Sequence, residues 1–221
     1  MVAPSRREWE RTKADIRDAD ERRGRARTPA ENSKLLAKER RLYADFRTSL
    51  GRYRVLDPAC GSGNFLALSL RALKDLDLAV LDDAAAMGLP PDNFRVGPEA
   101  VMGIEVNAYA AELARLTVWI TELQWQLRKG LGLTRRPILD KLDSIVRADA
   151  LITQSGKDSA WPEVDVVVGN PPFSAGRNGG NHSVMPMWSA CSPPSTVVCR
   201  RKPIWSPTGL GNPGSGCEID G

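Results

Sequence analysis

The sequence predicts an α/β fold in which a parallel sheet is covered by helices on both faces. Three observations support this fold class. Four short apolar runs each lead into a polar residue, helical patterns lie between the earlier runs, and a glycine turn joins the first run to a helix. The runs are Tyr53–Leu56 followed by Asp57, Ala100–Glu105, Ser144–Asp149, and Val164–Gly169 followed by Asn170.

The stretch from Val55 to Leu66, VLDPACGSGNFL, is the part around which the other elements are arranged. It is typical of a short buried strand that ends in an acid, a tight turn, and a helix that begins at once. Gly61 and Gly63 lack a Cβ, so the turn can adopt unusual dihedrals and a ligand can approach its backbone. Amides at the start of the helix would point toward that ligand. Alone, this unit is a weak indication of a nucleotide-like ligand.

Helical patterns surround this stretch. Residues 5–25 are polar on nearly every side, so we expect them to form a helix only by docking on another element. Further helices are predicted over Glu31–Leu50, through Leu66, Leu70, Leu73 and Leu76, and through Leu113, Leu116, Ile120, Leu123 and Leu127. The last set recurs at spacings of three and four, which predicts an amphipathic helix ending near Gly130. An irregular excursion is expected over Asp82–Pro98.

Composition limits the possible classes of protein. The chain has 221 residues and a net charge of +4, which suits one soluble domain. No apolar run is long enough to span a bilayer and no signal peptide is evident, so we expect a cytoplasmic protein without membrane contact. With one histidine and four unevenly placed cysteines, a disulfide framework and a metal site are not expected. Residues 1–50 carry 14 Lys and Arg against 9 Asp and Glu, a pattern more typical of a solvated helix than of a phosphate-binding surface.

Four polar residues, Asp57, Glu105, Asp149 and Asn170, follow the predicted strands. Ligands of parallel sheets bind outside the carboxyl ends of the strands, so these residues predict one site. A dinucleotide site would need a third glycine, where Leu66 stands, and an acid about 20 residues later. The ligand is therefore expected to have a ribose and an adenine-like base but no pyrophosphate. S-adenosylmethionine fits this description, although each acid by itself is more often a helix cap.

The segment Asp57–Leu66 (DPACGSGNFL) together with Asn170-Pro171-Pro172-Phe173 resembles the amino-methylating DNA methyltransferases. The resemblance is greatest to the adenine-specific enzymes of fused type II restriction–modification and phage-defence systems, and it covers residues 53–173. It implies a Rossmann-like class I sheet, S-adenosylmethionine as cofactor and double-stranded DNA as partner. The cofactor-binding positions carried over are Asp57, Pro58, Ala59, Gly61, Gly63, Asn64, Glu105 and Asp149; the catalytic positions are Asn170, Pro171, Pro172 and Phe173.

The resemblance also implies a role for each position. Asp57 would lie near the cofactor amine, Glu105 would bind the ribose hydroxyls, and Asp149 would bind the adenine N6. Asn170 and the Pro171 carbonyl would accept hydrogen bonds from the target amine, which would direct its lone pair at the sulfonium methyl without a strong base. The target base must leave the duplex, and the Phe173 ring would stack on it.

The sequence after residue 173 has a different character. Residues 174–221 hold 8 Gly, 6 Pro, 7 Ser and three of the four cysteines, which predicts an irregular tail, either disordered or read in a shifted frame. We therefore expect a charged helical segment over 1–50, a partial methyltransferase core over 51–173 with about four of seven parallel strands, and a tail over 174–221. On this interpretation the chain is a fragment without its recognition domain and has little or no activity alone. Alternatives are an N4-cytosine or protein glutamine-N5 methyltransferase and an inactive cofactor-binding remnant.

Overall fold

The chain divides into two compact units. The computed structural model describes residues 3–130, 142–153, 156, 159–170 and 199–200. The first unit comprises Met1–Tyr53 and Ser69–Ala100, and the second comprises Arg54–Leu68 and Val101–Gly221. The predicted site residues all belong to the second unit.

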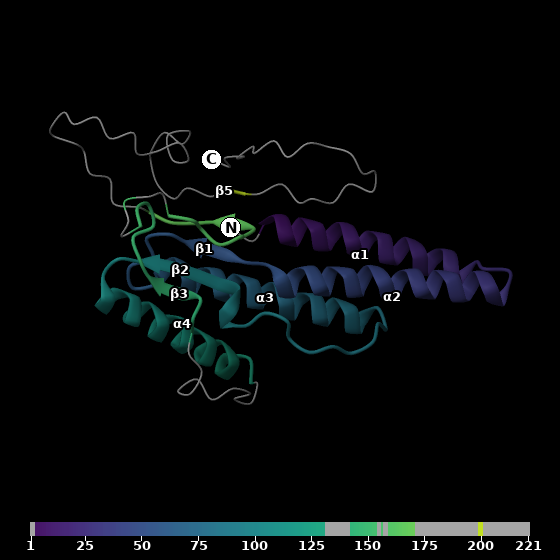
Figure 1. The fold of residues 1–221 in the computed structure, drawn as a ribbon. Helices are drawn as coiled ribbons and strands as arrows, with labels where there is room; N and C mark the ends of the chain where they lie inside the picture. Colours follow the sequence, from purple (N-terminus) through teal and green to yellow (C-terminus); the bar gives the residue numbers. More distant parts are fainter. Residues whose placement is uncertain (1–2, 131–141, 154–155, 157–158, 171–198, 201–221) are drawn as a thin grey trace. The chain divides into compact units, whose positions relative to one another are not determined.

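The first unit is built on a helical hairpin formed by α1 (Ala3–Gly24) and α2 (Pro29–Arg52), which pack along each other (Figure 1). The turn between them ends at Thr28, whose Oγ1 accepts a hydrogen bond from the Glu31 amide at 3.2 Å. Pro29 follows as the first helical residue, and the N–H group that proline lacks would have no partner within the helix at this position. This cap confirms the predicted break between two helices.

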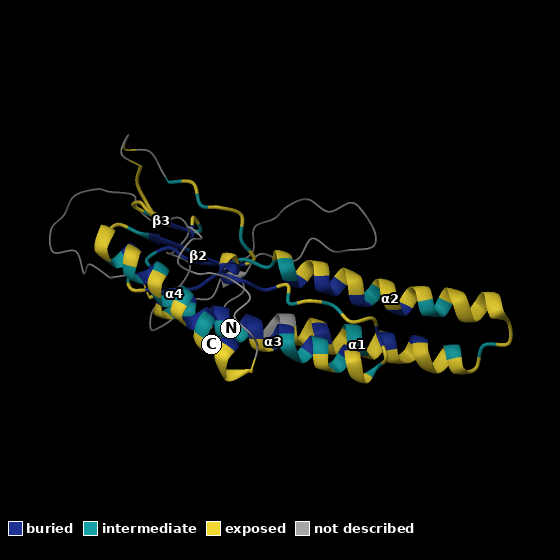
Figure 2. Cartoon of the chain, turned by 90° about the horizontal axis from the view of Figure 1, so that it is seen from below, coloured by how far each residue is buried: buried dark blue, intermediate teal, exposed yellow. Residues whose placement is uncertain are grey.

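The polar helix α1 is docked through a few large side chains on one side, as Figure 2 shows by its buried stripe. Trp9 is 1% exposed, and its ring centroid lies 5.0 Å from that of Phe46 on α2. The Trp9 indole also donates a 2.7 Å hydrogen bond to Asp83 of α3 (Asn64–Ala86). The expectation that residues 5–25 form a helix by docking is therefore confirmed.

The predicted excursion begins later than expected, because α3 continues to Ala86 and only residues 87–97 are irregular before the short helix η1 (Pro98–Ala100). This loop is fixed by a buried acid. Asp77 Oδ2 accepts hydrogen bonds from the Arg95 amide at 2.7 Å and the Val96 amide at 2.9 Å. Asp77 Oδ1 pairs with the Arg47 guanidinium of α2, and both side chains are at most 1% exposed.

The second unit contains the sheet, whose strand order is β3-β2-β1-β4-β5. The strands are β1 (Val55–Asp57), β2 (Val101–Glu105), β3 (Ile145–Arg147), β4 (Val166–Val167) and β5 (Cys199–Arg200). The first four are parallel, which confirms the predicted α/β class and strand number. β5 is antiparallel to β4 and comes from the tail that was expected to be irregular; the rest of that tail lies outside the described residues.

Helix α4 (Ala108–Arg128) packs on β2 and β3 and corrects one prediction. The helix itself is where the leucine spacing placed it, but the buried face is the opposite one. The hydrophobic residues on its buried face are Ala111, Ala114, Val118 and Trp125. Leu116, Ile120 and Leu127 of the predicted core stripe are at least half exposed. At Ala114 the inward-facing residue is small because this part of α4 lies against Gly63 of the glycine turn, as the next subsection describes.

Candidate functional site

The glycine turn has the geometry that its sequence predicts. Gly61 and Gly63 have positive φ angles of 52° and 85°, a region that residues with a Cβ rarely adopt. A Cβ on Gly63 would lie 3.0 Å from the Ala114 Cα of α4. The turn therefore requires glycine at position 63 for two independent reasons, and α3 can begin at Asn64, whose side chain is exposed.

The turn is also packed directly against β2. A Cβ on Gly103 would lie 2.8 Å from the Cys60 Sγ and 2.9 Å from the Leu66 Cδ1. The Cys60 amide donates a 3.1 Å hydrogen bond to the Ile104 carbonyl. Burial raises the pKa of the Cys60 thiol to about 12, so the thiol is neutral and serves packing rather than nucleophilic chemistry.

Glu105 joins the end of β2 to the glycine turn. Its Oε2 accepts a 2.9 Å hydrogen bond from the Gly61 amide, and its Oε1 accepts a 2.8 Å hydrogen bond from the Asn107 amide. The carboxylate is half-buried and held at both oxygens. Each carboxylate oxygen has a second lone pair, so a diol can still donate hydrogen bonds to it. Asn107 in turn caps α4 by accepting from the Tyr109 and Ala110 amides.

Asp57 at the end of β1 is a buried carboxylate with an unsatisfied oxygen. The residue is 1% exposed, and its Oδ1 accepts a 3.1 Å hydrogen bond from the Ala59 amide. Its Oδ2 has no hydrogen-bond partner among the described residues. Burial raises the pKa of Asp57 to about 6 despite the Ala59 hydrogen bond, and the charge of Glu105 adds to the increase. An ammonium group placed against Oδ2 would satisfy this oxygen and favour the ionised form.

The loop that leads to the proline pair begins beside Asp57. β4 pairs with β1 in parallel, and the Val168 amide donates a 2.8 Å hydrogen bond to the Leu56 carbonyl. A Cβ on Gly169 would lie only 2.8 Å from the Asp57 Oδ1. The structure therefore brings Asn170, which is exposed, to the same sheet edge as Asp57. Pro171, Pro172 and Phe173 lie outside the described residues.

Asp149 lies next along this edge, after β3. The Ala148 amide donates to the Glu105 carbonyl at 3.1 Å, which sets this segment beside the end of β2. Asp149 Oδ1 accepts from the Leu151 and Ile152 amides at 2.8 and 3.2 Å, so the acid caps a turn and stays exposed.

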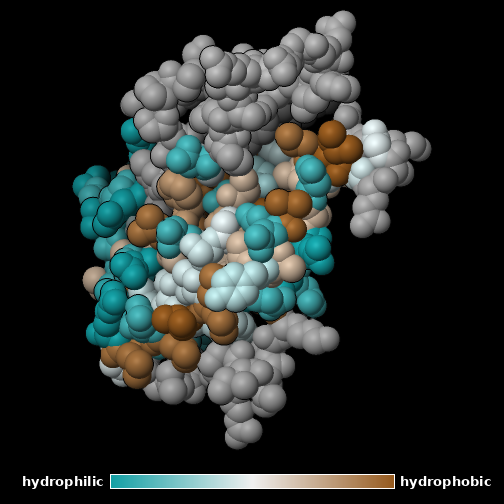
Figure 3. All heavy atoms as spheres, turned by 90° about the vertical axis from the view of Figure 1, so that its left-hand side faces the viewer, coloured by the Kyte–Doolittle hydropathy of each residue, from teal (hydrophilic) through white to brown (hydrophobic). Residues whose placement is uncertain are grey.

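Apolar side chains stand among these acids. Val106, Leu151 and Ile152 are 65%, 39% and 46% exposed. Figure 3, which looks at the side of Figure 1 where β2 ends, shows hydrophobic and hydrophilic residues interspersed on this face. Sequence reasoning missed these three residues, although each follows a predicted site acid by one to three positions. Exposed apolar groups between carboxylates suit a flat heterocycle with polar edges.

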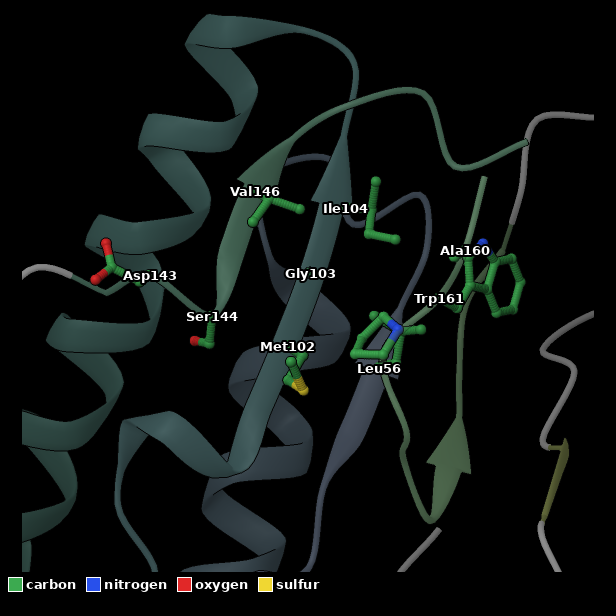
Figure 4. A pocket seen from close by; sticks show the side chains of 10 residues that line it. Leu56, Met102, Gly103, Ile104, Asp143, Ser144, Val146, Ala160 and Trp161 are labelled. Atoms are coloured by element: carbon green, nitrogen blue, oxygen red, sulfur yellow. The ribbon is translucent and has the colours of Figure 1, made fainter. Parts of the chain in front are cut away.

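A cavity of about 340 Å³ lies on the other face of the sheet (Figure 4). Leu56, Met102 and Ile104 point into it, and Trp161 lines its far side. Side chains alternate between faces along a strand, so these residues face away from Asp57 and Glu105. The predicted site residues do not line this cavity, which belongs to the core formed by Leu56, Ile104 and Val167.

Two kinds of feature are absent from the part of the chain that the structure describes. No group of three or more His, Cys, Asp and Glu residues there could hold a metal ion. No helix there is long and apolar enough to cross a membrane.

Comparison with known proteins finds relatives of one kind. A family model described as the DNA-methyltransferase domain of MmeI matches residues 32–187. DNA methyltransferase A of Bacillus subtilis (strain 168) is 28% identical over 142 residues, which cover 57% of this chain and 15% of that protein. The solved structure of the Type IIL restriction–modification enzyme MmeI in complex with DNA is 28% identical, with a TM-score of 0.43 over 51% of this chain and 16% of that one. The chain thus spans about one sixth of the length of these relatives.

Proposed function

Because this chain belongs to the family of the MmeI DNA-methyltransferase domain, we propose that it forms the cofactor-binding part of a restriction–modification DNA methyltransferase that acts on adenine N6. The observation that carries the proposal is the contact between Gly169 and Asp57. It brings the end of β1, next to the glycine turn, together with the beginning of the Asn170 loop. A methyl donor on one side of this edge would then lie within reach of an amine on the other.

The residues present fit S-adenosylmethionine. The unsatisfied Asp57 Oδ2 would pair with the cofactor ammonium, which supplies the missing donor for a buried carboxylate. Gly61, where a Cβ would meet no described atom within 4 Å, would leave space for the methionine backbone. Gly63 would line the same part of the cofactor through its backbone, and Pro58, Ala59 and Asn64 complete the turn. Glu105 would accept the ribose hydroxyls, Asp149 the adenine amine, and Val106 with Leu151 would contact the adenine ring. The bound cofactor supplies an electrophilic methyl group on sulfur.

The chain's own contribution to methyl transfer is to orient the target amine. An exocyclic amine on an aromatic ring is a weak nucleophile because its lone pair is delocalised. The Asn170 side-chain oxygen and the Pro171 carbonyl would accept hydrogen bonds from its two N–H groups and hold the nitrogen in line with the methyl group. As the N–C bond forms and the S–C bond breaks, the nitrogen becomes positively charged and would then release one proton to water. Phe173 would stack on the extruded base. No side chain needs to act as a strong base at any step.

Cofactor binding tests the proposal directly. We expect S-adenosylmethionine and S-adenosylhomocysteine to bind the purified chain in isothermal titration, and NAD not to bind, because the turn lacks the third glycine of a dinucleotide site. Glu105→Ala should abolish binding and Glu105→Gln should weaken it less, since the amide can still accept one hydrogen bond. Glu99→Ala, which removes an acid of the first unit, is the matched control and should leave binding unchanged. Equal binding by Glu105→Ala and the unsubstituted chain would remove the basis of the assignment.

The methylated base requires a second experiment. DNA from cells that express the intact gene is digested to nucleosides and analysed by mass spectrometry. N6-methyl-2′-deoxyadenosine supports the proposal, N4-methyl-2′-deoxycytidine would transfer it to cytosine, and DNA that gains neither nucleoside would contradict DNA as the target. The mechanism at Asn170 is common to these amines, so the identity of the base does not follow from the site chemistry alone.

A further inference from the structure

Asn107 belongs to the short connection between β2 and α4. The strand ends at Glu105 and the helix begins at Ala108. Only Val106 and Asn107 lie between them. Asn107 is the N-cap of α4: its backbone is extended, with φ of −80° and ψ of 119°. Its side-chain oxygen accepts hydrogen bonds from two amides of the first helical turn, at 2.9 and 3.2 Å. The side chain of Asn107 thus fixes the connection to the start of the helix.

The backbone amide of Asn107 fixes the same connection to the end of the strand. It donates a 2.8 Å hydrogen bond to Glu105 Oε1. The amide of an N-cap residue has no acceptor within its own helix, and in a capping box a glutamate or glutamine at the third helical position accepts it. That position is Ala110 here, which has no side-chain acceptor, and the Glu105 carboxylate takes its place. One residue therefore joins the helix start to the carboxylate.

The Glu105 carboxylate is also tied to the glycine turn, which lies against α4. Its Oε2 accepts the Gly61 amide at 2.9 Å. A Cβ on Gly63 would lie 3.0 Å from the Ala114 Cα. α4 thus supports the site at two points, by packing at Ala114 and by the cap at Asn107. Hydrogen bonds from two separate segments leave the carboxylate little freedom to rotate, which is what a ligand-binding group requires from its support.

We propose that Asn107 is a positioning residue for the contact between Glu105 and the cofactor ribose, an inference that rests on the proposed methyltransferase function. The Asn107 side chain acts through Glu105 and not on the cofactor itself. It holds the first turn of α4 and so keeps its own amide at Glu105 Oε1, which leaves the remaining lone pairs of the carboxylate in one geometry for the ribose hydroxyls. Without the cap the first turn loosens, and Glu105 loses one of its two fixed donors.

Isothermal titration with S-adenosylhomocysteine and with its 2′-deoxy analogue tests this role. The unsubstituted chain should prefer the ligand with the 2′-hydroxyl by about tenfold, because that hydroxyl donates to a charged acceptor. Asn107→Ala should bind S-adenosylhomocysteine about tenfold less tightly and should bind the two ligands almost equally. Asn107→Ser, which keeps a capping oxygen, should restore both the affinity and the preference.

Thr28→Ala is the matched control, because it removes the N-cap of α2 in the first unit. It should lower the midpoint of urea unfolding as Asn107→Ala does, and it should leave both the affinity and the preference unchanged. A preference for the 2′-hydroxyl that persists in Asn107→Ala would overturn the proposal even where affinity falls, since a purely structural cap would lower both affinities alike. An unsubstituted chain that binds neither ligand, or both equally, would instead remove the ribose contact of Glu105 from the proposed function, and this inference with it.

Discussion

Gly169 lies so close to Asp57 that a Cβ on the glycine would be 2.8 Å from the carboxylate Oδ1. The two residues are more than a hundred positions apart in sequence, yet this contact sets the spacing between the end of β1 and the loop that starts at Asn170. The carboxylate cannot move away freely, because its Oδ1 also accepts the Ala59 amide at 3.1 Å. The distance between the end of β1 and the loop that starts at Asn170 therefore depends on the absence of a Cβ at Gly169.

Gly169→Ala should consequently weaken cofactor binding. The added methyl group must displace either the Asp57 carboxylate or the Asn170 loop, and overpacking of this kind costs about 1–3 kcal/mol. The measurements are the affinity for S-adenosylmethionine and the midpoint of urea unfolding. Gly24→Ala is the control, because a Cβ there meets no described atom within 4 Å. Unchanged affinity in Gly169→Ala would show that the contact between Gly169 and Asp57 does not determine the geometry of the cofactor site.

Cofactor affinity should depend on pH through Asp57. Burial raises the pKa of this group to about 6, and the ammonium of the ligand pairs only with the ionised form. Affinity should therefore be highest above pH 7 and fall as pH decreases through 6. In Asp57→Asn the affinity should be weak and nearly constant across this range. A fall of the same size in the Asn variant would assign the pH dependence to another group.

The same shift makes Asp57 costly to the free protein. The pKa of Asp57 is higher in the folded state than in the unfolded state, so the folded protein binds the Asp57 proton more tightly. The stability that the protonated carboxyl contributes is fully present below about pH 4 and is lost as pH rises through 6. Asp57→Asn should therefore increase the free energy of unfolding at pH 8, by on the order of 1–3 kcal/mol. Urea unfolding at pH 8 without ligand measures this. A loss of stability would contradict it and would indicate that the carboxylate is satisfied.

The Arg47–Asp77 pair should dominate the stability of the first unit. Both side chains are at most 1% exposed, and Asp77 also holds the Arg95 and Val96 amides. Removal of one partner leaves a buried charge, so Asp77→Ala should cost about 3–5 kcal/mol in urea unfolding. Replacement of both partners by apolar residues should cost less than either single change. The exposed pair Arg41–Asp45 is the control, and Asp45→Ala should have an effect below about 1 kcal/mol.

Acid should loosen the attachment of α1. Burial raises the pKa of Asp83, but hydrogen bonds from Trp9 and Lys13 outweigh it and leave the pKa below its usual value. This contribution to stability is present above about pH 4 and is lost as pH falls through the depressed value. Tryptophan fluorescence, to which Trp9 contributes, should therefore change on acidification before the far-ultraviolet circular dichroism does. In Asp83→Asn the early fluorescence change should be absent.

Several features of the fold and site follow from local sequence. The positive φ angles at Gly61 and Gly63 favour residues without a Cβ. The acid-terminated apolar runs become β1, β2 and β3 because a short run of apolar residues is itself a local signal for a buried strand. The Thr28–Pro29 helix start is equally local. These signals sufficed for the α/β class, the four parallel strands and the family.

Other features depend on contacts between distant segments. The leucine spacing in α4 predicted a helix but the wrong buried face, because periodicity does not say which of two apolar faces meets the sheet. The close approach of Gly63 to Ala114 decides that the face with the small residue Ala114 turns inward at this point. Likewise, Glu105 was predicted to bind a ligand, and only the fold shows that it also fixes the Gly61 amide.

The sequence by itself determined the class of fold and the family and supplied the candidate site residues, because each depends on short patterns within one element. The tertiary structure decided which face of α4 packs on the sheet and why the Asp57 Oδ2 lacks a hydrogen-bond partner among the described residues. It also decided how close the loop that starts at Asn170 lies to Asp57. These features depend on distances between segments that only packing brings together. At Gly169, for example, the approach to Asp57 is possible only because the residue has no Cβ.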